Sequence, residues 1–139
     1  MKISIKSFIS IVLILVPVLI LTSCNSKGLP EGFNKDEVTE AAKSIVADAN
    51  NRDYEAVHAR IDGTLQGAIS VEEIKKAWDP ILDESGDFLD FDDVILSSKT
   101  GEEDLVYALA LVKCSYENGK HTYTFYFDED MTLNGLWMK

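Results

Sequence analysis

The sequence predicts an α+β domain in which three N-terminal helices pack on a curved, four-stranded antiparallel sheet. Helix-capping signals and apolar residues at helical spacing occupy residues 34–85, and strand-like alternation follows over residues 88–138. The strongest strand signal is the stretch 104–127, in which two alternating apolar runs meet at Asn118-Gly119. This dipeptide is typical of tight β-hairpins, because both turn positions need positive φ. Helices followed by a meander of strands favour a single helical layer on one face of the sheet.

Residues 1–23 form a predicted targeting segment that precedes this domain. Lys2 and Lys6 give the segment a positive start, and an apolar stretch follows over residues 8–21. It ends in Leu21-Thr22-Ser23-Cys24, which resembles the lipoprotein signal of bacteria, in which the cysteine receives acyl chains such as palmitate. Two alternatives are a single membrane-spanning helix, for which the apolar stretch is short, and an ordinary secretory signal with an incidental cysteine.

Lipidation of Cys24 predicts a protein anchored at the extracytoplasmic face of the cell membrane, because two or three acyl chains bind a bilayer stably. Residues 24–33 then form a short tether, and residues 34–139 form a single domain. Loss of residues 1–23 removes two of the 13 basic residues and none of the 24 acidic ones, which leaves a formal charge of −13. Such a domain has little with which to neutralise phosphates, and this excludes nucleic acid as a partner.

Two of the three helices begin with the same capping pattern. Asn34 is followed three residues later by Glu37, and Ser70 is followed in the same way by Glu73. A polar cap with an acidic residue at this spacing is typical of a helix start. The first helix carries an alanine-rich apolar stripe and is expected to end near residues 50–51.

The middle of the helical half is less regular. Asp53 is expected to cap a short second helix that ends before Gly63, and residues 63–67 are expected to form a break between helices. In the third helix, Asp79-Pro80 predicts a kink or a restart, because proline lacks the N–H group that an interior helical position needs.

Strands are predicted over residues 88–98, on both sides of the hairpin turn, and over residues 132–138. With Asn118-Gly119 as the turn, one face of the hairpin places small residues opposite aromatic ones. The predicted pairs are Cys114 with Tyr123, Val112 with Phe125, and Ala110 with Phe127. This face is the one that the helices are expected to cover.

A family resemblance rests on Trp78, on Ser85-Gly86-Asp87-Phe88 at the change from helix to strand, on the strand 123–128, and on Asn134-Gly135-Leu136. The order of helices and long hairpins resembles the cone-shaped nuclear transport factor 2-like superfamily. Within it, the residues resemble an uncharacterised family found in extracytoplasmic lipoproteins of Gram-positive bacteria and attached to hydrolases. The resemblance covers residues 36–138 and implies a pocket at the open end of the cone. It brings no catalytic residues.

Six side chains are the candidates to line such a pocket, although aromatic residues at these spacings also fill cores. They are Tyr54, His58, Trp78, Phe91, Tyr123 and Phe125. His58, with Asp62 one helical turn later, has the chemistry of a proton shuttle, and a buried acid is the alternative catalytic group that related enzymes use. Asp90 is the one acid inside an apolar run, and its alternation points outward.

Cofactor and metal chemistry find little support in the sequence. Cys114 is expected to be a buried, inert thiol on the face that the helices cover. The two histidines, the one remaining cysteine and the acidic cluster 87–93 do not match the spacing of a metal site. We therefore expect no cofactor and no metal.

The opposite face of the predicted sheet carries apolar residues away from the helices. Tyr107, Leu109, Leu111 and Tyr126 form this stripe, which is a candidate interface for a homodimer or another envelope protein. The sequence thus favours a non-enzymatic domain that binds a small apolar ligand or a protein. A small isomerase or hydrolase-like enzyme and a structural dimerisation module are the alternatives.

Overall fold

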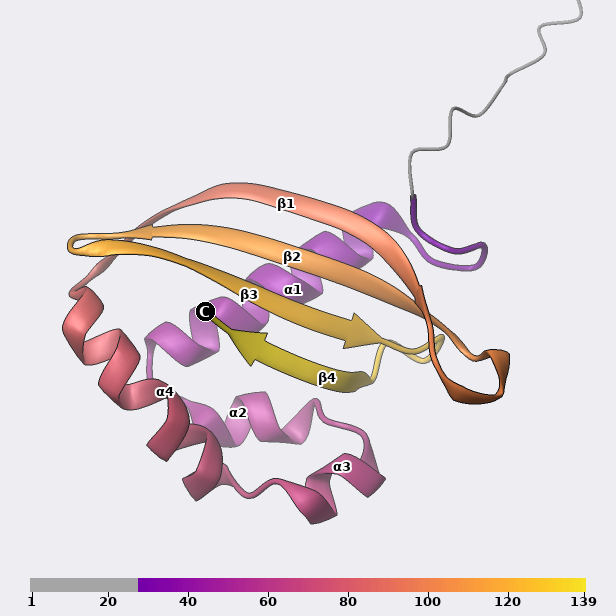
Figure 1. Cartoon of the computed structure of the whole chain (residues 1–139), viewed down its shortest axis with the longest axis horizontal. Helices are drawn as coiled ribbons and strands as arrows, with labels where there is room; N and C mark the ends of the chain where they lie inside the picture. Colours follow the sequence, from indigo (N-terminus) through magenta and orange to yellow (C-terminus); the bar gives the residue numbers. More distant parts are fainter. Residues whose placement is uncertain (1–27) are drawn as a thin grey trace, which may run out of the picture.

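The computed structural model describes residues 28–139, so the predicted signal segment and Cys24 lie outside the described residues. Four helices precede four strands, and one short 3-10 turn lies between the first two strands (Figure 1). They are α1 (Lys35–Asn50), α2 (Tyr54–Ala59), α3 (Gly63–Ala68), α4 (Val71–Ser85), β1 (Phe88–Thr100), η1 (Glu102–Asp104), β2 (Val106–Tyr116), β3 (Gly119–Phe127) and β4 (Leu133–Met138).

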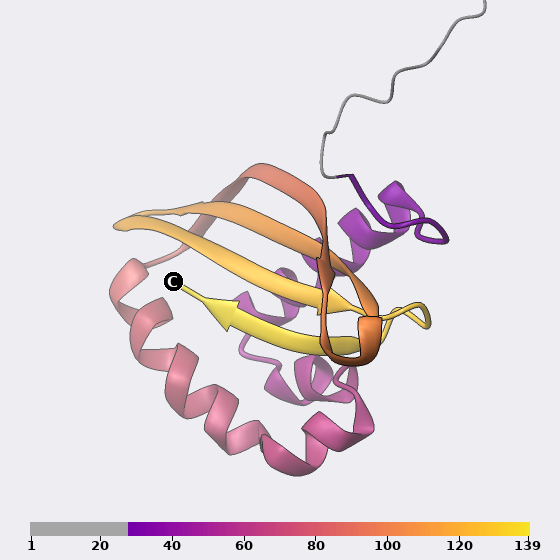
Figure 2. The same cartoon turned by 45° about the vertical axis from the view of Figure 1, so that its right-hand side comes forward.

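The four strands form one antiparallel meander in the order β1-β2-β3-β4. All four helices lie on one side of this curved sheet, and α1 crosses behind it in the view of Figure 1. Figure 2 shows the strands bending over the helical layer. The predicted α+β class is confirmed. The predicted number of helices is wrong, because the described chain has four rather than three.

The additional helix, α3, lies where a break between helices was predicted. Asp62 starts it: its carboxylate accepts from the Thr64 N–H at 3.0 Å, and its backbone carbonyl accepts from the Gln66 N–H at 2.7 Å. The Gln66 side chain then donates to the carbonyl of His58 at the end of α2. A cap and this tertiary contact stabilise one helical segment despite its two glycines, which disfavour helix by themselves.

The predicted helix starts are confirmed. The Asn34 side chain accepts from two backbone N–H groups of α1, Asp53 caps α2, and Ser70 with Glu73 forms a complete capping box on α4. The predicted restart at Pro80 is wrong, since α4 continues as one helix from Val71 to Ser85. Pro80 is exposed, so water can bond to the Lys76 carbonyl, which the missing proline N–H leaves without its partner in the helix.

The register of the β2–β3 hairpin differs from the predicted one by two residues. Tyr123 pairs with Val112 rather than with Cys114, and the turn shifts from Asn118-Gly119 to Glu117-Asn118. A shift of two residues leaves every side chain on its predicted face, because the side-chain period of a strand is two. The predicted faces are therefore correct although the predicted pairs are not.

Contacts with the end of α4 accompany this register. The N–H of Glu117 donates to the carbonyl of Asp87 at 3.0 Å, and the N–H of Asn118 donates to the carbonyl of Ser85 at 2.9 Å. The amide side chain of Asn118 also donates to the carbonyl of Glu84. The bonds to the Ser85 and Glu84 carbonyls satisfy acceptors at the end of α4 that have no partner within the helix.

The inner face of the sheet and the helices together form the core. Small residues of β2 face large residues of β3, as in the pairs Ala110 with Phe125 and Ala108 with Phe127. All of these side chains are buried, and so are the alanines Ala42 and Ala49 of α1, which let the helix approach the sheet closely. The core therefore fills the space between sheet and helices with side chains.

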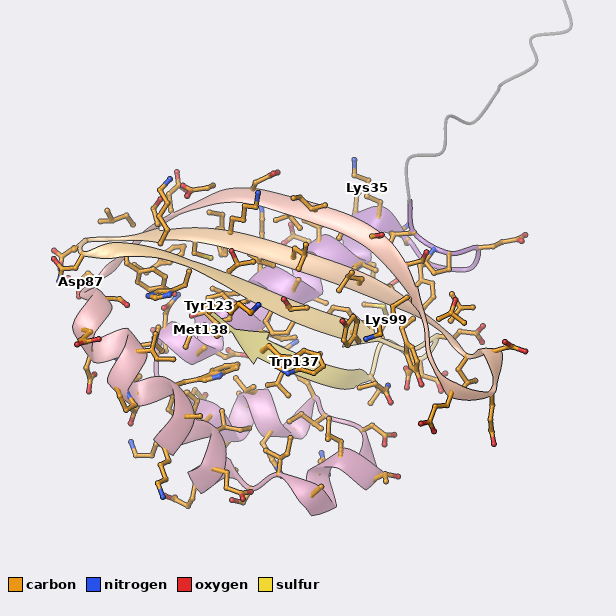
Figure 3. All side chains as sticks on the ribbon, in the orientation of Figure 1. Lys35, Asp87, Lys99, Tyr123, Trp137 and Met138 are labelled. Carbon is orange, nitrogen blue, oxygen red and sulfur yellow. The ribbon has the colours of Figure 1, made fainter. Side chains whose placement is uncertain are left out.

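The outer face of the sheet is partly open to solvent. Leu109 and Leu111 of β2 and Tyr126 of β3 are half-buried there. Trp137 of β4 is 52% exposed and packs edge-on against Tyr126, with ring centroids 5.1 Å apart. Figure 3 shows Trp137 and Lys99 on this side. Tyr107, the fourth residue of the predicted stripe, is half-buried on the same face, with its ring against Gly101.

Candidate functional site

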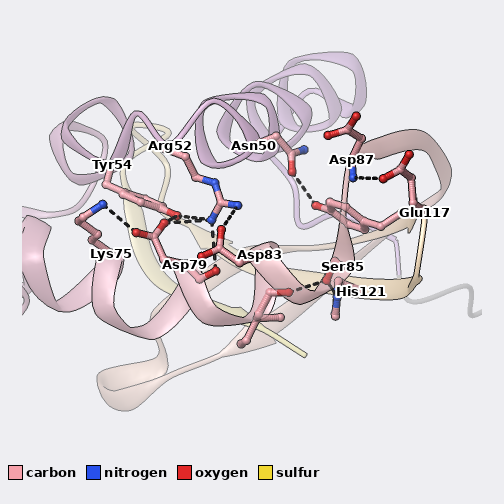
Figure 4. A network of polar contacts seen from close by, with 12 residues as sticks. Asn50, Arg52, Tyr54, Lys75, Asp79, Asp83, Ser85, Asp87, Glu117 and His121 are labelled. Carbon is pink, nitrogen blue, oxygen red and sulfur yellow. Dashed lines mark hydrogen bonds and ion pairs between the residues drawn. The ribbon is translucent and has the colours of Figure 1, made fainter.

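A cleft of about 480 Å³ lies at one end of the domain, where the C-terminal ends of α1 and α4 meet the beginning of β1. Figure 4 shows the polar side chains around it. Its walls combine three aromatic rings with amide groups and one guanidinium. They are formed by Ala47, Asn50, Asn51, Arg52, Leu82, Gly86, Asp87, Phe88, Phe91 and Tyr116.

The three rings make one continuous apolar wall. Phe88 contacts Phe91 with ring centroids 4.9 Å apart and contacts Tyr116 at 5.6 Å, in both cases edge-to-face. Such edge-to-face pairs stabilise each other beyond the area that they bury. The ammonium group of Lys43 lies 5.3 Å from the centre of the Phe91 ring. The wall thus forms an apolar platform of ring surfaces against which the apolar side of a ligand can pack.

Arg52 forms the charged side of the cleft, in a backbone conformation with φ of 60°. Its guanidinium donates to the carboxylates of Asp79 at 2.9 Å and Asp83 at 2.8 Å. Asp79 also accepts from the Lys75 ammonium at 2.7 Å and from the Tyr54 hydroxyl at 2.6 Å. Two cations and two carboxylates balance one another here, so Arg52 presents no unpaired positive charge to a ligand.

The pKa values in this cluster shift as these contacts require. Hydrogen bonds from Lys75 and then from Tyr54 lower the pKa of Asp79 below its ordinary value. Burial, followed by the bond to Asp79, raises the pKa of Tyr54 to about 12. The carboxylate is therefore ionised and the phenol neutral near pH 7, and neither is poised to exchange a proton.

A second, uncharged chain of hydrogen bonds connects the cleft to the core. The Tyr116 hydroxyl donates to Asn50 Oδ1 at 2.8 Å, and the Tyr123 hydroxyl lies 2.7 Å from that of Tyr116. Because an amide oxygen only accepts, Tyr116 uses its proton on Asn50 and accepts from Tyr123. Burial raises the pKa of both tyrosines. This chain orients the Asn50 side chain at the cleft wall.

The floor of the cleft is held by the hairpin turn. Gly86 has φ of 71° and φ/ψ values outside the helical region, and an added Cβ would lie 2.6 Å from Glu117 Oε2. The same carboxylate oxygen accepts from the N–H of Asp87 at 3.0 Å (Figure 4). Glycine is favoured here because this positive φ strains any residue with a side chain, and an added Cβ would also displace the Glu117 side chain.

The six predicted pocket residues do not gather around this cleft. Phe91 lines it, whereas Tyr54, Tyr123 and Phe125 are buried in the core. Trp78 lies 6% exposed between them, with ring centroids 6.3 Å from Tyr54 and 5.8 Å from Tyr123. These aromatic rings therefore fill space between the helices and the sheet. The open space lies farther along, where α1 and α4 end.

His58 also lies away from the cleft. Its Nε2 is 2.7 Å from the carbonyl oxygen of Ile69, so this nitrogen carries the proton. The carboxylate of Asp62, its predicted partner, instead accepts from the Thr64 N–H. His121 has its Nε2 within hydrogen-bond distance of the Ser85 hydroxyl and its Nδ1 3.0 Å from the Lys139 carbonyl oxygen. Both histidines serve as connections between elements.

The other candidate reactive groups named in the sequence are buried, exposed to solvent or paired. Cys114 is buried, and burial raises the pKa of its thiol to about 12. Asp90 is exposed, and Asp92 pairs with Ser115 and Lys120. No cluster of three or more histidine, cysteine, aspartate or glutamate side chains suited to a metal occurs within residues 28–139. In the same part of the chain, no helix is long and apolar enough to cross a membrane.

Of the residues predicted to line a pocket, only Phe91 lies at the cleft, and sequence reasoning missed the polar residues there. Asn50, Asn51 and Arg52 follow one another at the end of the first helix, where the sequence indicated only a helix stop. Their common position at a wall depends on the contacts with α4 and β2, which lie far away in sequence. The run of three polar residues was the one local signal that could have indicated them.

Comparisons with known proteins agree with this fold. An NMR structure of a protein from Ruminococcus gnavus ATCC 29149 is similar to the chain, with a TM-score of 0.71 and 30% sequence identity over 80% of this chain and 96% of that one. The search of curated proteins found no match. A family model described as "Protein of unknown function (DUF3887)" matches residues 42–136. Because this match spans more than half of the sequence, the chain belongs to the DUF3887 family.

Proposed function

We propose that the protein is a non-enzymatic binding module that holds a small, uncharged ligand in the end cleft. The observation that carries this proposal is the combination of the Phe88–Phe91–Tyr116 platform with amide groups in a cleft of about 480 Å³. Ligand sites of this size are typically apolar surfaces with a few polar groups that fix orientation. Asn50 is oriented by Tyr116, and the amide of Asn51 has no hydrogen-bond partner among the described side chains.

The charges of the cleft favour an uncharged ligand. Arg52 is already paired with Asp79 and Asp83, so a ligand carboxylate or phosphate would compete with existing ion pairs. The domain as a whole is acidic, which disfavours anions further. A molecule with one flat apolar side and hydroxyl or amide groups on its edge fits the platform and the asparagines together.

The titratable side chains within residues 28–139 give little support to the alternative that the protein is an enzyme. Every carboxyl group with a resolved shift in residues 28–139 has a lowered pKa, namely Glu73, Asp79 and Asp92. A general acid or base that works near pH 7 is most often a histidine or a carboxyl group with a raised pKa. The ring nitrogens of His58 and His121 that are described above contact carbonyl or hydroxyl oxygens. These features support binding over catalysis.

We also propose that Cys24 carries a lipid anchor and that the fold is a nuclear transport factor 2-like cone. The curved sheet with helices on its inner side supports the second point. The motif Leu21-Thr22-Ser23-Cys24 supports the first point. The described chain begins beside the N-terminus of α1, and the cleft lies at the opposite end of that helix. A helix of 16 residues is about 24 Å long. An anchored domain would thus hold its cleft away from the bilayer.

Ligand-observed NMR with the full-length chain in detergent micelles tests the cleft. The probe is a library of uncharged fragments, screened for saturation transfer. We expect binders whose signal is lost in Asn51→Trp, which fills the cleft mouth, and retained in Glu40→Trp, an exposed position on the same helix. Fragments that bind both variants equally, or a screen without binders, would contradict the proposal.

A second candidate function is self-association through the outer sheet face, as a homodimer or dimerisation module. The observation in its favour is the exposed Trp137 beside Tyr126, next to the half-buried Leu109 and Leu111. Sedimentation of the full-length chain in detergent tests it. A dimer that dissociates in Leu111→Lys would support this function, and a monomer at all concentrations would exclude it.

A further inference from the structure

We propose that the free edge of β4 binds an extended, basic peptide segment of a partner protein as a fifth strand of the sheet. One large apolar side chain of this peptide would occupy a hollow between β4 and α4. The site is distinct from the end cleft and does not depend on the function proposed for it. Extended peptides are commonly recognised in this way, through backbone bonds to a sheet edge and a side-chain pocket beside it.

The backbone of β4 directs hydrogen-bonding groups away from the sheet. Thr122 and Lys139 exchange both of their backbone bonds, at 3.0 and 3.1 Å. In an antiparallel pair such hydrogen-bonded positions alternate with positions that face the other way. Leu136 and Met138 therefore direct their N–H and C=O groups away from β3, at the free edge of the sheet. Within residues 28–139, these groups form no backbone hydrogen bond with a loop or a helix.

The chain itself already uses one end of this edge. The N–H of Leu133 donates to the carbonyl of Arg60 at 2.8 Å, and its carbonyl accepts from the N–H of Asp62 at 2.9 Å. Ile61 thereby forms a parallel bridge with Leu133. The α2–α3 connection is thus a one-residue fifth strand, and the edge beyond it, at Leu136 and Met138, is open to a further extended segment.

A hollow of about 150 Å³ lies next to this open edge. Trp78 and Leu136 contribute apolar surface, and the other lining residues are Ile69, Glu73, Ile74 and Ala77. Its volume suits one large aliphatic or aromatic side chain. A peptide paired with β4 would direct every second side chain towards α4 and the remaining ones towards the outer face beside Trp137.

Charge and shape select the kind of segment. Glu73 lines the hollow together with Leu136. With this carboxylate beside the hollow and an acidic domain behind it, a basic peptide is complementary. Because α4 lies on the helical side of this edge (Figure 2), a single extended chain fits beside β4 more readily than the sheet of a second folded copy.

The test is selection of a displayed random peptide library on the full-length chain in detergent micelles. We expect enriched peptides that are basic and contain one large apolar residue, and that bind more weakly as salt increases. Leu136→Pro removes the outward N–H without removing a bond to β3, since proline is tolerated at such edge positions. Ala77→Trp fills the hollow. Each substitution is expected to weaken the selected peptides at least about tenfold, a difference of about 1.4 kcal/mol.

Ala59→Trp is the matched control, because it places the same ring at an exposed helical position outside the hollow. It is expected to change peptide affinity less than about twofold, which corresponds to well under 1 kcal/mol. If Leu136→Pro does not fold, Ala77→Trp still decides the question. The proposal is overturned if no sequence is enriched, if the peptides bind all variants alike, or if Leu136→Pro instead dissociates a dimer of this chain.

Discussion

The two faces of the same sheet differ in what covers them. On the inner face, Phe125 and its neighbours are buried beneath α1, α2 and α4. On the outer face, one residue farther along the strand, Tyr126 is half-buried and contacts Trp137 and the Lys99 side chain, whose ammonium lies 4.5 Å from the ring centre. Similar aromatic residues therefore contribute to stability on one face and are available for contacts on the other.

The largest expected difference between the faces concerns adjacent aromatic residues of β3. Phe125→Ala should lower the free energy of unfolding by about 3 to 5 kcal/mol, because it leaves a cavity in a closed core. Tyr126→Ala should cost less than about half of that, because solvent already reaches this ring. Urea unfolding of both variants measures the contrast. Equal losses would show that the outer face is covered in solution, as a dimer would cover it.

A smaller effect on stability is expected where a small residue of β2 faces a large residue of β3 on the inner face. Ala110 lies opposite Phe125 and is completely buried, so Ala110→Leu should overpack the core and cost about 1 to 3 kcal/mol. Leu111→Ile, at the neighbouring half-buried position on the outer face, should change stability by less than about 1 kcal/mol. Thermal unfolding of the two variants checks this. A tolerated leucine at position 110 would indicate a looser core than the one described.

The smallest effect is expected from an ion pair on the outer face. Hydrogen bonds from Ser115 and Lys120 lower the pKa of Asp92 below its ordinary value of 3.8. A lowered folded-state pKa stabilises the protein above the unfolded-state pKa, and this contribution is lost as the pH falls through the folded-state value. Asp92→Asn should therefore be slightly less stable than the wild type at pH 7 and equally stable below about pH 3. Urea midpoints at both pH values test this, and a constant difference would exclude the ion pair as its cause.

Local sequence determined most of the secondary structure and both faces of the sheet. The capping residues Asn34, Asp53 and Ser70 start the predicted helices, because their side chains bond to backbone groups only two or three residues away. Alternation assigns Phe125 inward and Tyr126 outward for the same reason, since it depends on the strand alone. Such short-range effects can be read without knowing where the rest of the chain lies.

Tertiary structure alone decided the hairpin register, the existence of α3 and the position of the cleft. Alternation does not distinguish registers two residues apart, and in the folded chain the turn at 117–118 bonds to the end of α4. The cleft likewise depends on Trp78 filling the space below the sheet and on Arg52 reaching Asp79 across 27 residues. These contacts join residues far apart in sequence, so their geometry exists only once the helices and the sheet have packed together.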